Sequence, residues 1–214
     1  MVGFGLGLLG CDGELEDAET DSGSGGGESG NASGDDDDSG SASDSASGGD
    51  SESSDGGESD VPGNEYCIGV SSWDSAMVEF EEDVLLLVNE VRAAGASCGG
   101  QSFGPAGPLT MDPALRCAAR VHSRDMAERD FFDHVNPDGQ DPFVRMEFAG
   151  YSYFTAGENI AAGQASPAMV MQGWMDSPGH CSNIMNASFE DIGVGVFESD
   201  GVYRHLWTQT FGAQ

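Results

Sequence analysis

Apolar residues recur every three or four positions between Ser75 and Ala94, with polar and acidic residues between them. Residues at this spacing lie on one face of a helix, so the pattern predicts an amphipathic α-helix over 75–94. The apolar face is formed by Phe80, Val84, Leu87, Val88 and Val91. Gly95 is expected to end the helix, because glycine readily adopts the conformation that closes many helices.

Three further helices are predicted by a capping residue followed directly by proline. An Asp or Ser side chain accepts hydrogen bonds from the first free amides of a helix, and proline suits the first helical position. The three pairs are Asp112-Pro113, Asp141-Pro142 and Ser166-Pro167. We expect these helices to run to about Arg129, to near Gly150 and to Trp174.

Near the C-terminus the spacing of apolar residues changes to every second position. Ile192, Val194 and Val196 alternate with glycine, which predicts a β-strand. Gly193 and Gly195 leave the other face of this strand without side chains, so we expect another backbone or helix to pack closely there.

A second strand is predicted for residues 202–211, after a turn at Ser199-Asp200-Gly201. Helices first and an antiparallel hairpin last indicate the α+β fold class. A domain of about 150 residues is large enough to bury a core without help.

Residues 1–60 differ from the rest of the chain in composition. They hold 17 of the 38 acidic residues and none of the 7 basic ones, which are all arginine, in a chain of net charge −31. Residues 12–60 are mostly Ser, Gly, Asp and Glu, with too few apolar side chains to offset the entropy of ordering. We therefore predict a disordered acidic linker over 12–60, acting as a tether, and a folded domain over 61–214.

Charge also limits the partners. Nucleic acid is excluded as a partner, because phosphate binding needs clustered cations that this sequence lacks. Calcium capture by the run Asp35–Asp38 is weaker than the tether interpretation, since a solvated run lacks a shaped oxygen cage.

Residues 1–11 have the character of a partial export signal. A short Gly/Leu-rich run ends in Leu8-Leu9-Gly10-Cys11, which resembles a bacterial lipobox, where cleavage precedes a lipidated cysteine. The run is shorter than the ~20 residues of a membrane-spanning helix and lacks the basic residues of a complete signal peptide. We predict lipidation of Cys11 and hence a membrane anchor; the alternative is a chance occurrence of these four residues.

Four cysteines remain when Cys11 is set aside. Because this number is even, we expect them to form disulfides in an oxidising compartment. They are Cys67, Cys98, Cys117 and Cys181. Of the three pairings we favour Cys98–Cys117 with Cys67–Cys181, because a loop before a helix folds back on it easily. The competing interpretation makes Cys181 a catalytic thiol beside His180, although sequence neighbours rarely have the mutual geometry this requires.

Three residues are candidates for one polar site. The turn at 177–179 contains Pro and Gly and presents His180 at the start of the next element. His134 follows two phenylalanines, and Glu158 lies between the two histidines in the chain. The spacings exceed one helix face, so only tertiary folding brings the three together. Two imidazoles and one carboxylate are ligands that suit Zn²⁺ or another divalent cation.

These residues belong to a series of motifs that resembles the CAP superfamily in its bacterial, SCP-like form. This is the superfamily of cysteine-rich secretory proteins, antigen 5 and plant pathogenesis-related proteins. The motifs are His122-Ser123, Met126-Ala127, Phe131-Phe132-Asp133-His134, Pro137-Asp138-Gly139, Gly157-Glu158-Asn159-Ile160-Ala161, the stretch from Trp174 to Asn183, Ile192-Gly193-Val194-Gly195-Val196 and Trp207-Thr208-Gln209. The resemblance covers about residues 84–212 and implies an α-β-α sandwich with a small antiparallel sheet.

The resemblance also implies a site. In the family, two histidines and two glutamates typically line a central cleft, and in some members the histidine pair binds a divalent metal. His134, Glu158 and His180 match three of the four positions. The position of the second glutamate holds Ser177, and the adjacent Asp176 would point elsewhere, which weakens any acid/base pair.

Structural interpretations stand beside these. Glu158 is alternatively a residue that hydrogen-bonds the amides of its loop, and His134 a satisfied, partly buried histidine. We interpret His122 as structural because it lies outside the family's ligand set, and His205 lies in a predicted strand without a convincing partner.

The sequence leaves three functional hypotheses. The favoured one is an extracytoplasmic CAP-domain protein, surface-anchored or secreted and monomeric, that binds a lipid, glycan or protein through a metal-capable cleft. The second is a hydrolase in which Glu158 or a metal-bound water is the base; against it stand the missing fourth carboxylate and the absence of a His-Glu-x-x-His motif from the sequence. The third is a surface spacer whose tail matters more than its domain.

Overall fold

The computed structural model describes residues 8–9, by their backbone alone, and residues 60–214. Both stretches belong to one compact unit. The predicted lipidation site Cys11 and nearly all of the predicted linker lie outside the described residues. Among the residues described, no helix is long and apolar enough to cross a membrane.

Four of the described helices, α1 to α4, lie where capping and periodicity predict them, whereas η1 and α5 were not predicted. They are the 3-10 helix η1 (Ile68–Val70), α1 (Ser75–Ala94), α2 (Pro113–Arg129), α3 (Pro142–Ala149), α4 (Pro167–Asp176) and α5 (Pro178–Ile184). The Asp112 carboxylate accepts hydrogen bonds from the amides of Ala114 and Leu115, as expected for an N-cap. Gly95 ends α1 with a φ of 78°. The four predicted helices are therefore confirmed.

One mixed sheet forms the middle of the domain, in the strand order β1-β5-β7-β6-β4. Its strands are β1 (Leu8–Leu9), β4 (Thr110–Met111), β5 (Thr155–Ala162), β6 (Asp191–Glu198) and β7 (His205–Ala213), and a separate hairpin joins β2 (Ala96–Cys98) to β3 (Gln101–Phe103). The three long strands are antiparallel, with Glu158 opposite Thr210 and Val194 opposite Gln209, whereas β1 and β4 add in parallel to the outer strands.

Two features of the sheet differ from the prediction. The sequence places Glu158 in a loop, because the residues around it include few β-branched ones and show no alternation. In the structure these residues form strand β5, since they pair with β7 over the whole length of the strand. Strand β7 begins at His205 rather than at 202, since the Ser199 amide bonds the Arg204 carbonyl and closes a longer turn. Val202, at the tip of that turn, is 89% exposed.

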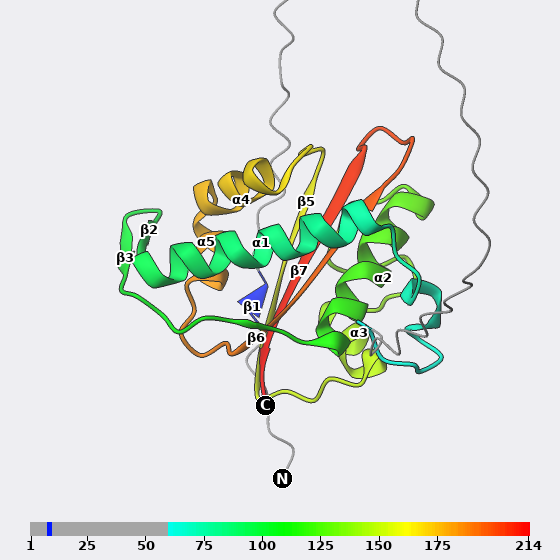
Figure 1. Cartoon of the computed structure of the whole chain (residues 1–214), viewed down its shortest axis with the longest axis horizontal. Coiled ribbons are helices and arrows are strands. Elements are labelled where there is room, and N and C mark those ends of the chain that lie inside the picture. The colour runs from blue at the N-terminus through cyan, green and yellow to red at the C-terminus, as the bar shows by residue number, and fades with distance from the viewer. Residues whose placement is uncertain (1–7, 10–59) are drawn as a thin grey trace, which may run out of the picture. The chain divides into compact units, whose positions relative to one another are not determined.

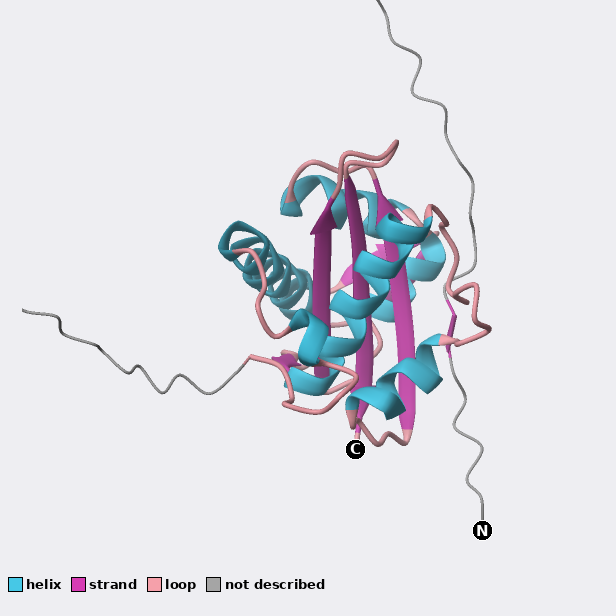
Figure 2. Ribbon diagram, turned by 90° about the vertical axis from the view of Figure 1, so that its right-hand side faces the viewer, coloured by secondary structure: helices cyan, strands magenta, loops and turns pink. Residues whose placement is uncertain are grey.

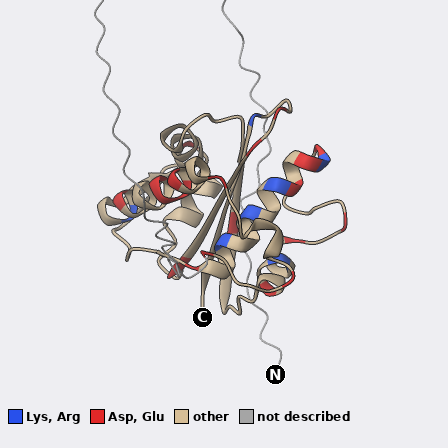
Figure 3. Cartoon of the chain, turned by 45° about the vertical axis from the view of Figure 1, so that its right-hand side comes forward, with Lys and Arg blue, Asp and Glu red and all other residues tan. Residues whose placement is uncertain are grey.

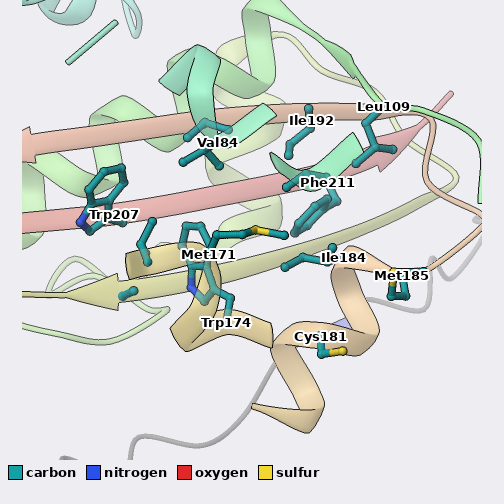
Figure 4. Close-up of a cluster of buried hydrophobic side chains, with 14 of the residues drawn as sticks. Val84, Leu109, Met171, Trp174, Cys181, Ile184, Met185, Ile192, Trp207 and Phe211 are labelled. Atoms are coloured by element: carbon teal, nitrogen blue, oxygen red, sulfur yellow. The ribbon is translucent and has the colours of Figure 1, made fainter. Parts of the chain in front are cut away.

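Helices cover both faces of the sheet, which gives the predicted α-β-α sandwich. Figure 1 shows α4 and α5 on one side of the sheet and α2 and α3 on the other, and α1 packs against α4 and β6. Figure 2 shows β5, β7 and β6 standing side by side behind α2. The larger apolar core lies between the sheet and α1, α4 and α5, and Figure 4 shows Trp174, Trp207 and Phe211 within it.

The face of β6 without side chains receives α2, as predicted. A Cβ on Gly193 would lie 2.0 Å from the carbonyl carbon of Leu115, and one on Gly195 would lie 2.4 Å from the Arg120 nitrogen. The Ser123 hydroxyl also donates to the Gly195 carbonyl at 2.9 Å. Helix α2 therefore lies directly on the sheet, which fixes the position of the loop that follows it.

Charged side chains inside the domain hold its elements together. Arg120 is fully buried and pairs with the buried Glu81 and, at 2.6 Å, with Asp60. The composition places Asp60 at the end of the linker, and this contact joins it to the domain. Arg92 is also buried, and its guanidinium donates to four backbone carbonyls, those of Gly107, Ile184, Asn186 and Phe189.

All four predicted cysteines form disulfides, but the favoured pairing is wrong. The bonds are Cys67–Cys117 and Cys98–Cys181. Cys117 lies on α2 and faces the segment at η1, whereas the hairpin that carries Cys98 folds toward α5 rather than back onto α2. The bond to Cys98 also overturns the interpretation of Cys181 as a catalytic thiol.

Candidate functional site

His134 lies in the loop that leaves α2. The helix ends at Asp130 in a left-handed conformation, with a φ of 52°. Asn136 then holds the loop: its side-chain oxygen accepts from the amides of Asp138 and Gln140. The His134 imidazole is 17% exposed, and its Nδ1 lies 2.8 Å from an oxygen of Glu158.

Glu158 is the buried centre of this arrangement. It lies in β5, has no exposed surface, and accepts hydrogen bonds on both carboxylate oxygens from Nη2 of Arg145, at 3.0 and 2.8 Å. Burial alone would raise the pKa of Glu158, but Arg145, His122 and His134 outweigh it and lower that pKa to about 2. The carboxylate is therefore ionised throughout the physiological range.

Arg145 connects the glutamate to the histidine loop. Its Nη1 donates to the carbonyls of His134 and Gln140, at 2.9 and 2.8 Å, while its Nη2 bonds Glu158. One guanidinium thus fixes both the backbone of the loop and the carboxylate that its histidine contacts. A planar guanidinium with several donors suits this double role.

His122 lies behind the pair, on α2. It is fully buried, its Nε2 bonds the Asp133 carbonyl at 3.0 Å and lies 3.9 Å from Glu158. Burial, helped by Arg145 and His134, lowers the pKa of His122 to about 4, in spite of the opposing effect of Glu158. A neutral His122 donates from Nε2 to a carbonyl, which fits a structural role.

His180 lies on α5, which packs against β5. It is the third residue of α5 and is half-buried, and its carbonyl accepts from the Asn159 side chain at 3.2 Å. Asn183, also on α5, donates to the Glu158 carbonyl and to the Asn159 side chain. The disulfide at Cys181 ties the same helix to the β2–β3 hairpin.

All three predicted residues lie in or against β5. His134 contacts the Glu158 carboxylate, and the His180 carbonyl accepts from the side chain of the next residue of the strand, Asn159. Within the described part of the chain, no group of three or more His, Cys, Asp or Glu residues is placed to hold a metal ion.

The geometry assigns a tautomer to His134. An ionised carboxylate only accepts hydrogen bonds, so Nδ1 of His134 donates to Glu158 and carries the proton. In a neutral imidazole the lone pair then lies on Nε2. A carboxylate that accepts a hydrogen bond from one ring nitrogen orients metal-binding histidines in this way.

The family's fourth position supplies no carboxylate to this arrangement. Asp176 is exposed and accepts a hydrogen bond from Gln172 within its own helix. Ser177 begins α5 as its N-cap residue.

Sequence reasoning missed Arg145, although a signal was present. The buried positions of α3 are Pro142, Arg145, Met146 and Ala149, so this arginine occupies the core-facing side of its helix. A cation at such a position needs a buried anion, because an unpaired buried charge is very unfavourable.

The comparisons with known proteins agree with this fold. Residues 85–211 match the family model described as CAP, cysteine-rich secretory protein family. The chain belongs to this family.

Relatives from Bacillus subtilis (strain 168) match part of the chain. YkwD, an uncharacterized protein, is 47% identical over 104 residues, which make up 49% of this chain and 39% of YkwD. YlbC, an uncharacterized membrane protein, is 30% identical over 139 residues, 65% of this chain and 36% of YlbC. The chain thus spans well under half the length of these relatives.

A crystal structure of an extracellular protein containing an SCP domain, from Bacillus anthracis, has the same fold. The TM-score is 0.56 at 26% identity, and the match covers 67% of this chain and 44% of that one. An outer surface protein from Borrelia burgdorferi, at 20% identity and a TM-score of 0.51, shares the fold over 62% of this chain and 93% of its own.

Proposed function

We propose that this CAP domain is an extracytoplasmic ligand-binding module whose ligand contacts His134 and His180 beside β5. The single observation that carries the proposal is the buried bridge from Arg145 to Glu158 to His134. Ordering three side chains and a loop around one partly exposed imidazole is costly in entropy, and it yields a ring of fixed orientation whose Nε2 is an acceptor. The ligand belongs to an undetermined class: lipid, glycan or protein.

A hydrolase with Glu158 as its base fits this geometry less well. A general base works best when its pKa lies near the operating pH, whereas the pKa of Glu158 is lowered to about 2. Its oxygens are also engaged by Arg145 and His134. Glu158 acts in our proposal as the residue that positions His134.

A divalent cation could be bound by the two imidazoles, but the site offers it few other protein ligands. His134 and His180 would hold it, with the remaining positions filled by solvent or ligand, and it would supply Lewis-acid attraction for an anionic or carbonyl group. Such a two-ligand ion exchanges readily and contributes little to folding. Because protons compete for the imidazole nitrogen, its affinity should weaken below about pH 6.5.

Two observations support a location outside the cytoplasm. The domain has two disulfides, which form and persist in oxidising compartments. The Bacillus anthracis protein of the same fold is described as extracellular. Anchoring through Cys11 is part of the proposal; absence of labelling by a palmitate analogue, with no effect of Cys11→Ser on membrane association, would exclude it.

The proposal is tested by calorimetric titration of zinc into the full chain at pH 7.5. We expect His134→Ala and His180→Ala each to weaken binding at least about tenfold. His205→Gln is the control, because this histidine packs against Phe80 and Trp207 instead. Equal zinc uptake by the wild type and both alanine variants would show that the pair binds no metal.

A further inference from the structure

A cavity lies apart from the residues around His134. Its volume is about 450 Å³, within the usual range of small-molecule sites. It is formed where the start of α1, the middle of α2 and the turn between β6 and β7 meet. The residues around it are Gly69, Ser72, Trp73, Asp74, Met77, Arg124, Phe197, Glu198, Ser199 and Asp200. None of these residues takes part in the arrangement around Glu158.

Two aromatic rings form an angled wall of this cavity. The ring centroids of Trp73 and Phe197 are 5.7 Å apart, and their planes meet at 51°. Trp73 already accepts one cation: the guanidinium carbon of Arg120 lies 5.3 Å from its ring centroid. Arg120 is fully buried and does not line the cavity, so it approaches the ring from the interior. Angled aromatic faces attract weakly hydrated cations through the ring quadrupole.

The charge around the cavity has the matching sign. Three carboxylates line it, those of Asp74, Glu198 and Asp200, against the single guanidinium of Arg124. Arg124 is already engaged, since its Nη1 donates to the Gly69 carbonyl at 2.5 Å and its Nε lies 3.9 Å from Glu128.

The carboxylates differ in how far they are engaged. Glu198 pairs with the exposed Arg204, and one oxygen of Asp74 caps α1. Asp200, in the turn, makes no hydrogen bond or ion pair to any residue that the structure describes. Its charge is therefore the most available of the three to a ligand.

The rest of the surface offers few cations to compete. Four of the seven arginines are buried, and the other three, Arg124, Arg129 and Arg204, each face a carboxylate. Figure 3 shows acidic positions spread over the helices and loops of the domain and basic positions concentrated on α2. The field around the cavity is negative, which raises the local concentration of cations.

We propose that this cavity binds an organic cation with an alkylated ammonium head. The aromatic wall contacts the alkyl groups and the carboxylates balance the charge. A small inorganic ion would gain nothing from the aromatic wall, and a neutral group of the same shape would gain nothing from the carboxylates. The combination of the two selects for a cation with an apolar surface.

The test uses choline and its uncharged isostere 3,3-dimethyl-1-butanol as probes of the full chain. Backbone amide shifts are followed by two-dimensional NMR during each titration. We expect choline to shift the amides of Asp74, Met77 and 197–200 with a dissociation constant in the millimolar range. The isostere should bind at least about fivefold more weakly, since it lacks the cation–π and charge terms.

Variants locate the effect. Asp200→Asn should weaken choline binding about two- to fivefold, and Trp73→Leu should weaken it further. Asp176→Asn removes an exposed carboxylate elsewhere and serves as the matched control. If Trp73→Leu lowers the melting temperature strongly, Trp73→Phe keeps an aromatic face and should retain part of the affinity.

Three results would overturn the proposal. They are equal affinities for choline and its isostere, equal effects of Asp200→Asn and Asp176→Asn, and the absence of saturable shifts at this cavity. None of them bears on zinc binding by His134, so this proposal and the proposed function fail separately.

Discussion

Glu158 links the structure of this domain to its proposed function at the level of single residues. Its carboxylate accepts hydrogen bonds from Arg145 and from His134; the contact with Arg145 is buried and the contact with His134 is partly buried. Removing one partner of such a pair leaves an unpaired buried charge, which typically costs about 3–5 kcal/mol. The same contacts thus stabilise the domain and orient its candidate binding residue.

Acid should destabilise the domain in two steps. The pKa of His122 is lowered from 6.5 to about 4, so its neutral form stabilises the fold fully above about pH 6.5 and this contribution is lost as the pH falls through 4. The pKa of Glu158 is lowered from 4.5 to about 2, so its contribution is present above about pH 4.5 and is lost toward pH 2. We expect the free energy of unfolding to fall by about 1 kcal/mol per pH unit between pH 6 and 4.5 because of His122.

Urea unfolding at several pH values measures this dependence. His122→Gln is the matched variant, because its amide can still donate to the Asp133 carbonyl but does not titrate. Its stability should vary less than that of the wild type between pH 6.5 and 4.5. Identical pH profiles for the two proteins would contradict a neutral, buried His122.

At the scale of elements, the sequence predicts the helices better than the sheet. Helix starts depend on local chemistry, as at Asp112 with its following proline, and these were predicted correctly. Strand β5 depends on its partner β7, since few of its own residues favour a strand, and such pairing is not visible locally.

For the site, too, the sequence predicts the residues but not the contacts between distant parts of the chain. His134, Glu158 and His180 were recognised from motifs, but the contacts between them were not. Arg145 reaches Glu158 across 13 residues of chain, through a loop and two elements whose packing had to be known first. The cysteine pairing failed for the same reason, because the direction of the β2–β3 hairpin is set by its contact with α5.

The contact of α2 with β6 gives a sharp test of the packing. Gly193→Ala would place a methyl group 2.0 Å from backbone that cannot move aside, so we expect a loss of more than about 3 kcal/mol, or failure to fold. Gly107→Ala is the control, because nothing lies within 4 Å of its added Cβ. Thermal melting of the two variants distinguishes them, and a Gly193→Ala protein as stable as the control would contradict the close approach.

The two disulfides should differ in their effect on the site. Replacing either pair by alanine is expected to cost about 2–4 kcal/mol of stability. Only the bond from Cys98 to Cys181 holds α5, so only its loss should also weaken zinc binding through His180. Titration of the two double variants, with Cys67→Ala/Cys117→Ala as the matched control, tests this. Equal affinities in both would show that the bond does not position the histidine.

On the scale of the whole molecule, arginine is used mainly inside. Arg92, Arg116, Arg120 and Arg145 are buried and joined to carboxylates or carbonyls, while most carboxylates face solvent. The domain thereby combines a firmly cross-linked interior with an acidic surface, which favours solubility and cationic partners.

The described core should fold without the acidic segment. The buried side chains of the described core lie at or after Val61, so deletion of residues 12–57, which keeps β1 and Asp60, should change the melting temperature by no more than a few degrees. Asp60 pairs with Arg120, and adding Asp60→Asn to the shortened chain should cost about 1 kcal/mol. A loss of many degrees on deletion alone, measured by calorimetry, would show that the N-terminal segment is part of the folded unit.

The orientation of His134 by Glu158 is tested most directly by the ring-nitrogen shifts of this histidine in ¹⁵N NMR at pH 8. We expect a protonated Nδ1 and an unprotonated Nε2, with zinc perturbing Nε2 of His134 together with the ring of His180. Glu158→Gln should relax the tautomer preference and weaken the response to zinc. A His134 protonated on Nε2 in the wild type, or rings that do not respond to zinc, would contradict the proposed binding site.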